Sequence, residues 1–307
     1  IKSAHPFWGY PFADVSVVHN GQLTNYWNNR RALENRGMRF MSECDSELIA
    51  VYLANKNYKV YGTARRLNEM TPIINAGGNA FKLDVTKEED IINGVNYVIE
   101  KEGRIDVLWN NAGFGLWGAV EDISIERAKN QFDVNLLGVF HCCQAYLNLL
   151  GADRSLNGNP GKIINISSIS GEIGMPFMSA YNMSKFGLEG FSEGIRRELL
   201  MYGIDVVVIA PGPVKTPIWG KINKREEIKR YDNSDYRESL SRAMKMTEKM
   251  EQVGVEPRVI AERALSIVEN TKSSTRYRID PTRIQNILLQ LFPKRMADKM
   301  IAKRMGI

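Results

Sequence analysis

Apolar runs of strand length alternate with amphipathic helical patterns along most of the 307-residue chain. The runs at residues 105–109, 163–166 and 204–210 are almost uninterrupted, which is typical of strands buried on both faces of a parallel sheet. Helical spacing of apolar positions predicts helices at residues 87–102, 124–150, 181–200, 218–252 and 256–270. From about residue 55 to residue 307, this alternation predicts an α/β fold with a doubly wound, Rossmann-like parallel sheet.

Shorter β-rich runs predict further strands at residues 59–63, 81–85 and 277–279. Thr86 is expected to cap the helix that follows the second of these runs. Pro211 and Gly212 end the apolar run at 204–210 and predict a loop there.

Tyr181 and Lys185 form the candidate chemical pair. They are four residues apart and lie on one face of the predicted helix. An ammonium beside a phenol is expected to lower the tyrosine pKa, so that the hydroxyl can exchange a proton with a carbonyl or alcohol. Ser168 stands at the end of the run at 163–166 and is expected to hydrogen-bond the same oxygen.

The spacing of these three residues, within SISGEIGMPFMSAYNMSKFGLEGF, resembles the short-chain dehydrogenase/reductase family. The details are most similar to the branch that acts on hydroxysteroids, retinoids and other lipid alcohols. The resemblance implies that Tyr181 is the general acid/base, that Lys185 tunes it and holds the cofactor ribose, and that Ser168 orients the reacting oxygen. Asn135, in the word FDVN, would hold a relay water. The implied reaction interconverts a secondary alcohol and a ketone, with a lipid- or steroid-like substrate.

The same resemblance implies a nicotinamide cofactor along the strand ends. Arg65 and Arg66 follow a strand, and arginine at this position favours NADP(H) over NAD(H) because it accommodates the extra phosphate; ordinary surface arginines remain the alternative. The remaining implied cofactor contacts, besides Tyr181 and Lys185, are Asp84, Val85, Asn111, Ala112, Gly113, Pro211, Gly212 and Thr216.

Residues 1–54 do not continue this pattern, and we expect a foreign α+β fragment there, with a strand at 15–18 and a helix at 23–36. The words HPF, VVHNGQLTNYW, RRALENRG and CDSELIAVYLA resemble a class II glutamine amidotransferase domain. The resemblance implies an oxyanion hole at Asn20 and Gly21 and binding of the substrate amino group by Asp45. The family's nucleophile is an N-terminal cysteine, whereas Ile1 stands first here and Cys44 is internal. We therefore expect no amidotransferase activity.

The glycine-rich motif TGxxxGIG, which binds the cofactor pyrophosphate in the dehydrogenase family, has no counterpart in this chain. The dehydrogenase sheet is therefore predicted to have its first strand missing or replaced, and its activity to be impaired. One alternative is that residues 15–18 fill the central strand position and residues 19–22 form a makeshift turn. We do not expect that turn to function, because Gly21 alone does not let the backbone close on a pyrophosphate. A further alternative is an inactive chimeric remnant.

The formal net charge of +6 is concentrated in the C-terminal third, at residues 221–230 and 294–304. No nucleic-acid motif accompanies it, so a nucleic-acid partner is not expected, whereas the basic, amphipathic stretch 284–307 could lie on a membrane surface. His141, Cys142 and Cys143 are expected to be packing residues, with no metal site and no disulfide. Without a visible signal peptide or membrane span, we predict a cytoplasmic protein. Homo-oligomers through residues 124–150 and 181–200 are implied by the resemblance.

Overall fold

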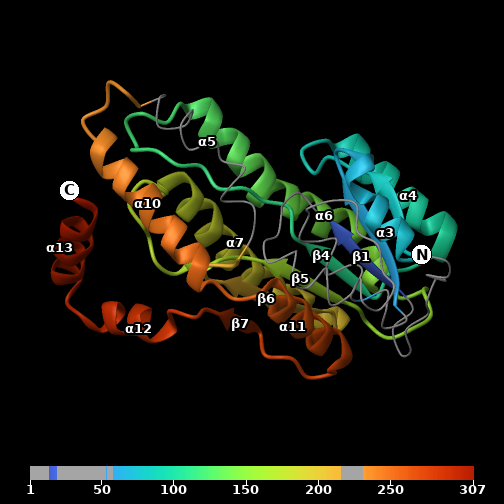
Figure 1. Ribbon diagram of the computed structural model, residues 1–307. Coiled ribbons are helices and arrows are strands. Elements are labelled where there is room, and N and C mark those ends of the chain that lie inside the picture. The colour runs from blue at the N-terminus through green and yellow to red at the C-terminus, as the bar shows by residue number, and fades with distance from the viewer. Residues whose placement is uncertain (1–13, 19–52, 54–57, 216–230) are drawn as a thin grey trace.

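The computed structural model describes residues 14–18, 53, 58–215 and 231–307 (Figure 1). Within them, seven parallel strands form one sheet in the order β3-β2-β1-β4-β5-β6-β7. The strands are β1 (Asp14–Val18), β2 (Lys59–Ala64), β3 (Asn79–Lys82), β4 (Val107–Asn110), β5 (Lys162–Ile166), β6 (Asp205–Pro211) and β7 (Arg276–Ile279). The predicted doubly wound parallel sheet is confirmed.

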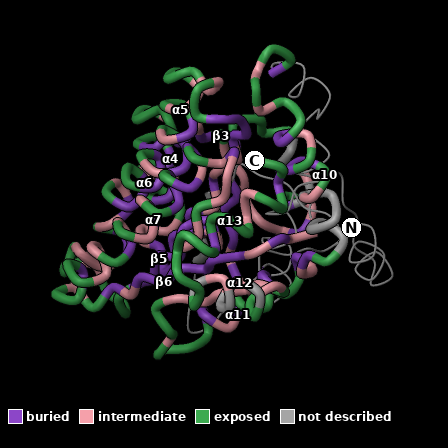
Figure 2. The backbone as a smooth tube through the Cα atoms, turned by 90° about the vertical axis from the view of Figure 1, so that its left-hand side faces the viewer, coloured by how far each residue is buried: buried purple, intermediate pink, exposed green. Residues whose placement is uncertain are grey.

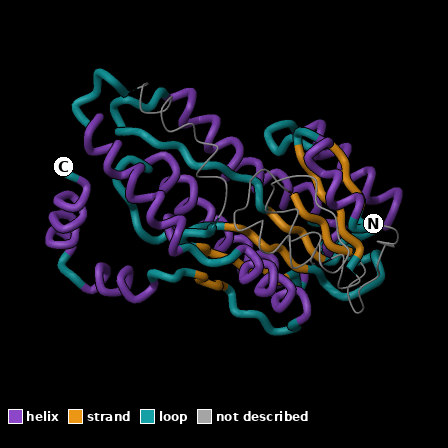
Figure 3. The backbone as a smooth tube through the Cα atoms, viewed as in Figure 1, coloured by secondary structure: helices purple, strands orange, loops and turns teal. Residues whose placement is uncertain are grey.

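Helices connect these strands and cover the sheet (Figure 3). The α-helices are α3 (Thr71–Asn75), α4 (Glu88–Glu102), α5 (Ile125–Phe132), α6 (Gly138–Tyr146), α7 (Ser179–Glu198), α10 (Arg237–Val253), α11 (Pro257–Glu269), α12 (Arg283–Leu291) and α13 (Lys294–Met305). The short turns are η1 (Leu67–Met70), η2 (Asp133–Leu137), η3 (Asn148–Leu150), η4 (Ile169–Gly171) and η5 (Leu199–Tyr202). The predicted helix at 124–150 is thus one run of α5, η2, α6 and η3, and η2 is a π-helical turn inside it.

The first strand is replaced rather than missing. β1 comes from the segment that resembles a different family, yet it lies between β2 and β4 in the middle of the sheet. Its register is regular on both sides, with Val17 opposite Gly62 of β2 and Trp109 of β4. The alternative in which residues 15–18 fill the central strand position is therefore correct for the strand. The turn at residues 19–22 and the predicted helix at 23–36 lie outside the described residues.

Two apolar cores account for the uninterrupted strand runs. Successive residues of a strand point to opposite faces of a sheet, so a strand covered on both sides must be apolar at every position. Accordingly, Leu108 and Trp109 belong to different cores, as do the pairs Ile163/Ile164 and Val206/Val207. The first core includes residues of η1, α3 and α11: Met70, Ile73, Ile260, Ala264 and Val268. The second includes residues of α4, α6 and α7: Ile91, Val98, Cys142, Tyr146 and Leu188.

A third apolar cluster lies beside the sheet, where α10 and α13 meet the loops that follow β4 and precede α7. Its buried members are Trp117, Ala119, Phe177, Tyr231, Leu240, Ala243, Met244 and Met305, with Met175, Met178, Tyr236, Met246 and Ile301 packed against them. The Tyr231 hydroxyl donates a hydrogen bond to the Trp117 carbonyl at 2.6 Å. The loop after β4 is thereby tied to the chain that leads into α10.

Two local expectations were wrong. Thr86 does not cap α4, because its hydroxyl donates to Asp84 Oδ1 at 2.7 Å and the helix begins two residues later. His141 is exposed rather than packed, because it lies on the outer side of α6, whereas Cys142 and Cys143 are buried as expected.

Neither a metal cluster nor a spanning helix occurs in the part of the chain that the structure covers. No three His, Cys, Asp or Glu side chains gather there in a way that could hold a metal ion. Within the same residues, every helix is too short or too polar to cross a bilayer.

Candidate active site

The candidate site lies at the carboxyl edge of the sheet. All strands are parallel, so the residues that follow β4, β5 and β6 emerge at the same edge. The strand order reverses between β1 and β4, and ligands of open α/β sheets bind outside the carboxyl ends of the strands at such a point. Asn110, Ser167 and Pro211 stand at or directly after three of these strand ends.

Asn135 is fully buried in the π-helical turn η2. Its Oδ1 accepts a hydrogen bond from the Phe114 N–H at 3.0 Å, and its Nδ2 donates to the Phe114 carbonyl at 2.9 Å and to Ser184 Oγ at 3.1 Å. A π turn widens the helix by one residue and often marks a functional position. Asn135 therefore links the loop after β4 to α7 instead of bonding its own backbone.

Lys185 is 4% exposed and lies on α7, one turn after Tyr181. Its Nζ donates to the Ile166 carbonyl at the end of β5, at 2.8 Å, and lies 5.9 Å from the centroid of the Tyr181 ring. Burial lowers the pKa of Lys185 to about 8, while the Glu189 carboxylate acts in the opposite direction. The sequence prediction that these two side chains share one helix face is consistent with this contact.

The predicted direction of the tyrosine pKa was wrong for this structure. Burial raises the pKa of Tyr181 above its ordinary value, and a hydrogen bond with Ser168 only partly opposes that shift. Residue spacing placed Lys185 beside the phenol, but it carried no information on burial, which disfavours the charged form of both groups. Tyr181 is therefore protonated at neutral pH.

Ser168 connects β5 to the turn η4. Its backbone is extended, and its Oγ accepts a hydrogen bond from the Ser170 N–H at 3.1 Å, which caps the turn. The preceding residue, Ser167, donates its N–H to the Ile209 carbonyl of β6 at 2.8 Å. Two neighbouring strands and a capped turn thus hold the hydroxyl that hydrogen-bonds Tyr181.

Gly113, in the turn after β4, leaves the space that Asn135 and Lys185 need. A Cβ at this position would lie 3.3 Å from Asn135 Oδ1 and 3.5 Å from Lys185 Nζ. The backbone at Gly113 therefore approaches these two side chains closely, with no side chain of its own in between. This cradle fits the close backbone approach that binding of a nicotinamide cofactor requires.

The other predicted cofactor residues are spread along the same edge. Arg65 and Arg66 are exposed and directly follow β2. Asp84 is turned toward Thr86, while Val85 is buried and would contact a Cβ at Gly138 of α6.

Pro211 ends β6, and the Gly212 N–H donates to the Ile279 carbonyl of β7 at 2.8 Å. The structure thus brings together Ser168, Tyr181, Lys185, Asn135 and Gly113. Outside the described residues lie Thr216, as well as Ile1, Asn20, Gly21, Cys44 and Asp45 of the N-terminal segment.

Sequence reasoning missed a buried amide chain beneath the site. Asn110 Nδ2 donates to Asn165 Oδ1 at 2.9 Å, and Asn165 Nδ2 donates to Ser192 Oγ, also at 2.9 Å. Ser192 in turn donates to the Leu188 carbonyl of α7 at 2.7 Å. The chain ties β4, β5 and α7 together, and an asparagine within each of two apolar strands was the signal that could have revealed it.

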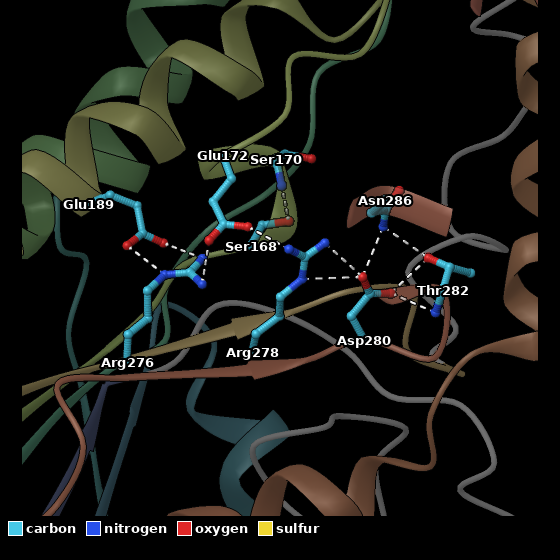
Figure 4. A network of polar contacts seen from close by, with 9 residues as sticks. All are labelled: Ser168, Ser170, Glu172, Glu189, Arg276, Arg278, Asp280, Thr282 and Asn286. Atoms are coloured by element: carbon cyan, nitrogen blue, oxygen red, sulfur yellow. Dashed lines mark hydrogen bonds and ion pairs between the residues drawn. The ribbon is translucent and has the colours of Figure 1, made fainter. Parts of the chain in front are cut away.

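An ionic network along β7 was also missed (Figure 4). Arg276 pairs with Glu189 of α7 at 3.0 Å and with Glu172, directly after η4, at 2.6 Å. Arg278 pairs with the same Glu172 at 3.0 Å and with Asp280 at 3.0 Å. Strand β7 is thereby paired with Glu172 at the end of the serine turn, by which we mean Ser168 and η4. It is also paired with Glu189 of α7, which lies one helical turn after Lys185.

Phe177 shows an unusual backbone just before α7. Its φ is 63°, in the left-handed region that disfavours bulky residues, and its side chain is buried in the third cluster. Its carbonyl accepts from the Gly118 N–H at 2.9 Å, and its ring packs against Tyr236 with centroids 5.8 Å apart. This conformation connects the loop after β4 to the entry of the helix that carries Tyr181.

Comparison with known proteins agrees with this arrangement. Residues 47–227 match the family model of the short chain dehydrogenases, and residues 2–73 match a glutamine amidotransferase domain. Among solved structures, a short-chain dehydrogenase from Streptomyces avermitilis superposes with a TM-score of 0.67 at 21% identity, over 96% of this chain and 97% of that chain. A levodione reductase superposes with a TM-score of 0.63 at 22% identity, over 77% and 91%. These two likenesses concern the fold.

Among characterised sequences, an NADPH-dependent 3-dehydrocapnine reductase of Ornithobacterium rhinotracheale is 31% identical over 81% of this chain and 89% of its own length. A 3-ketodihydrosphingosine reductase of Bacteroides thetaiotaomicron is 34% identical over 76% and 83%. Human retinol dehydrogenase 8 is 33% identical over 64% of each chain. The family match over more than half of the chain, together with these relatives, shows that the chain belongs to the short-chain dehydrogenase family.

Proposed function

We propose that this chain interconverts a secondary alcohol and a ketone of a lipid-like molecule with NADP(H), and that its cofactor binding is weaker than in relatives with a glycine-rich loop. The observation that carries the proposal is the convergence of Ser168, Tyr181 and Lys185 at the carboxyl edge of the sheet. A proton donor, a hydroxyl and a buried ammonium meet there beside a glycine cradle.

The proton steps follow from these residues in the direction of reduction. The raised pKa keeps Tyr181 protonated at neutral pH, so its hydroxyl can give a proton to the carbonyl oxygen of the substrate. Ser168 hydrogen-bonds the same oxygen and orients it. The Lys185 ammonium stabilises the phenolate that remains, and Asn135 holds the relay water that returns the proton. The bound cofactor supplies the hydride that the carbonyl carbon accepts.

Two features support NADP(H) as the cofactor. The guanidinium groups of Arg65 and Arg66 follow β2, where an acidic residue would instead pair with the ribose hydroxyls of NAD. One relative carries NADPH in its name. Asn111, Ala112 and Gly113 would lie along the ribose, with Asp84 and Val85 near the adenine, and Pro211, Gly212 and Thr216 near the nicotinamide.

The lipid-like substrate is supported by the third apolar cluster. Met175, Phe177 and Met178 pack in or against it and precede Tyr181 by three to six residues. Met side chains are unbranched and adapt to irregular apolar shapes. Two related reductases are named for 3-dehydrocapnine and 3-ketodihydrosphingosine. We therefore choose 3-ketodihydrosphingosine as the test substrate.

Oligomer formation through α5, α6 and α7 is part of the same proposal. Leu137 and Phe140 on the first helical run are 47% and 44% exposed, and Met183 and Phe186 on α7 are 56% and 46% exposed. Apolar side chains gathered in this way on adjacent helices are typical of a protein–protein interface. A second chain packed on this face would cover them.

The deciding experiment measures NADPH consumption with 3-ketodihydrosphingosine for the wild type and for Tyr181→Phe. The variant should lose about 1,000-fold in kcat, because general acid catalysis contributes about 10² to 10⁴. Its NADPH affinity, measured by fluorescence titration, should stay within about twofold. Tyr202→Phe, a tyrosine just after α7, is the matched control and should retain wild-type activity.

Three outcomes would contradict the proposal or a part of it. Activity of Tyr181→Phe above a tenth of the wild-type value would remove Tyr181 from the proton step. Absence of both NADPH binding and turnover in the wild type would favour the inactive remnant. NADPH binding as tight as that of the Bacteroides relative, measured side by side, would show that the missing glycine-rich motif does not weaken cofactor binding.

Glutamine amide transfer is the second candidate, favoured by the match of residues 2–73 to an amidotransferase domain. Release of ammonia from glutamine is its direct test. We expect none, and release above that of buffer alone would revive this candidate.

A further inference from the structure

The last two helices form an arm of distinct charge. We call α12 and α13, residues 283–307, the C-terminal arm; it continues from β7 along the outside of the molecule (Figure 1). Its ionised side chains are Arg283, Lys294, Arg295, Asp298, Lys299, Lys303 and Arg304. These give the arm a formal side-chain charge of +5, out of +6 for the whole chain. The other 282 residues are therefore nearly neutral.

The cations of the arm are exposed, and no ion pair involves them within the described residues. This contrasts with Arg276 and Arg278 of the adjoining strand β7, which are both paired with carboxylates. The arm thus presents uncompensated positive charge to its surroundings.

Much of α13 is exposed (Figure 2). Large apolar side chains are among the exposed residues of the arm. Ile284 and Leu291 are each 76% exposed and are seven residues apart, on one face of α12. Met296 and Met300 are 50% and 48% exposed and are four residues apart on α13. At 100° per residue, Lys299 and Lys303 flank these two methionines on one side and Arg304 flanks them on the other.

The inner face of α13 already has its partners. Ala297 and Met305 are buried, and Met305 belongs to the third apolar cluster with Phe177. Ser239 Oγ of α10 donates to the Gly306 carbonyl at 2.7 Å, which fixes the end of the helix. Met296 and Met300 are therefore on a second face of α13. Through Met305, the arm packs on the third apolar cluster, which contains residues just before Tyr181 in the sequence.

We propose that the outer face of the C-terminal arm binds the surface of an anionic lipid bilayer, with α13 lying in the plane of the headgroups. Exposed apolar side chains flanked by lysine and arginine are the features that such binding requires. Helices of 9 and 12 residues are too short to span a bilayer. A second copy of this chain fits less well, because a symmetric contact would place two arms of charge +5 against each other.

This binding would bring the apolar cluster beside Tyr181 close to lipid, and in this respect the inference rests on the proposed lipid substrate. The binding itself does not depend on catalysis. It can therefore be measured without NADPH or ketone, so that its failure and the failure of the proposed function remain distinguishable.

The test is co-sedimentation of the full chain with vesicles of phosphatidylcholine alone or mixed with phosphatidylglycerol. The wild type should bind the anionic vesicles and should be released by high salt, because salt screens the attraction. Lys299→Gln with Lys303→Gln should weaken binding about 25-fold, since each lysine near a charged surface contributes about fivefold. Met296→Ser with Met300→Ser should weaken it about tenfold.

Matched controls separate the arm from the rest of the surface. Ile92→Ser with Ile99→Ser removes two side chains of α4 that are each 48% exposed, and Lys87→Gln removes an exposed charge before α4. Both should bind within twofold of the wild type, and thermal melts should show that all variants fold.

Equal binding of the wild type to neutral and anionic vesicles would overturn the proposal. So would arm variants that bind as tightly as the wild type, or no binding to anionic vesicles at all. Arm variants that lower the mass in sedimentation equilibrium, without vesicle binding by the wild type, would show instead that the face joins two chains.

Discussion

The sheet has an N-terminal half, β1 to β3, and a C-terminal half, β4 to β7. The two halves differ in the turns at the carboxyl ends of their strands. After β4 and β5, the turn with Gly113 and the serine turn are held by buried side chains and hydrogen bonds. β1 pairs with its neighbours in equally regular register, yet the sequence after it contains Gly21 and no glycine-rich motif. A strand needs only backbone pairing and suitable side chains, so an unrelated segment can supply it. A phosphate-binding turn needs particular residues at particular positions.

The largest expected effect concerns Lys185, in the C-terminal half of the sheet, and the way in which stability depends on pH. Its lowered pKa of about 8, against an ordinary 10.5, means that burying the ammonium costs about 3 kcal/mol below pH 8. Because the unfolded chain binds the extra proton, the stability of the wild type should rise as the pH increases from about 8 to 10.5. Lys185→Met should abolish this rise, as measured by urea unfolding across that range.

The exposed Lys129→Met should keep the rise and serves as the control. An unchanged pH dependence in Lys185→Met would mean that the ammonium is not buried as described, and the contrast between the halves would weaken.

The next largest effect concerns the N-terminal half, where the turn after β1 is expected to limit NADPH affinity. Replacing residues 19–26 by a glycine-rich TGxxxGIG sequence should tighten NADPH binding about 100-fold, because a hydrogen bond to a charged phosphate contributes up to about 3 kcal/mol. The measurement is a fluorescence titration. The same replacement with alanine in place of each glycine should give no gain; equal gains from both would show that glycine geometry is not what β1 lacks.

A smaller effect is expected for Asp280, whose side chain is 0% exposed beside Arg278. Burial alone would raise the pKa of Asp280, but hydrogen bonds from Thr282, Asn286 and Arg278 outweigh it and lower the pKa. The carboxylate therefore stabilises the fold above its unfolded pKa, and this contribution is lost as the pH falls through the lowered value. Asp280→Asn should cost about 2 kcal/mol at pH 7.

The difference between Asp280→Asn and the wild type should shrink below about pH 4. The exposed Asp235→Asn should change stability by less than about 0.5 kcal/mol at any pH. A loss that is independent of pH would mean that shape, rather than charge, is what the network requires.

The smallest effect returns to the N-terminal half. Arg65→Ala with Arg66→Ala should weaken NADPH binding about tenfold by removing a charge-assisted contact with the extra phosphate. NADH binding should be unchanged, and Lys82→Ala, an exposed cation at the end of β3, should affect neither cofactor. Equal losses for NADPH and NADH would identify the arginines as ordinary surface residues.

Local pattern was sufficient to predict most of the fold. The runs that became β4, β5 and β6 were located to within two residues, because strands covered on both faces must be apolar throughout. The strand at 15–18 was also predicted, but its place in the sheet was left open. Val17 pairs with Trp109, which is 92 residues away. The pattern of a short alternating segment does not indicate which distant strand it will pair with.

The site was predictable where spacing along one helix decides contact, as for Tyr181 and Lys185. It was not predictable where burial or distant pairing decides. The raised pKa of Tyr181 depends on burial, which spacing does not encode. Arg276 and Glu189 are 87 residues apart, and in the sequence each is one charged residue among many.

The position of β1 has a consequence for the integrity of the sheet. Among the described strands, β1 alone connects the pair β2–β3 to the group β4–β7 through backbone hydrogen bonds. A chain shortened to begin after residue 18 would leave two facing rows of unsatisfied amide and carbonyl groups, about 10 Å apart. Such open edges recruit strands from neighbouring molecules, so truncation would favour aggregation over a smaller, independently folded enzyme.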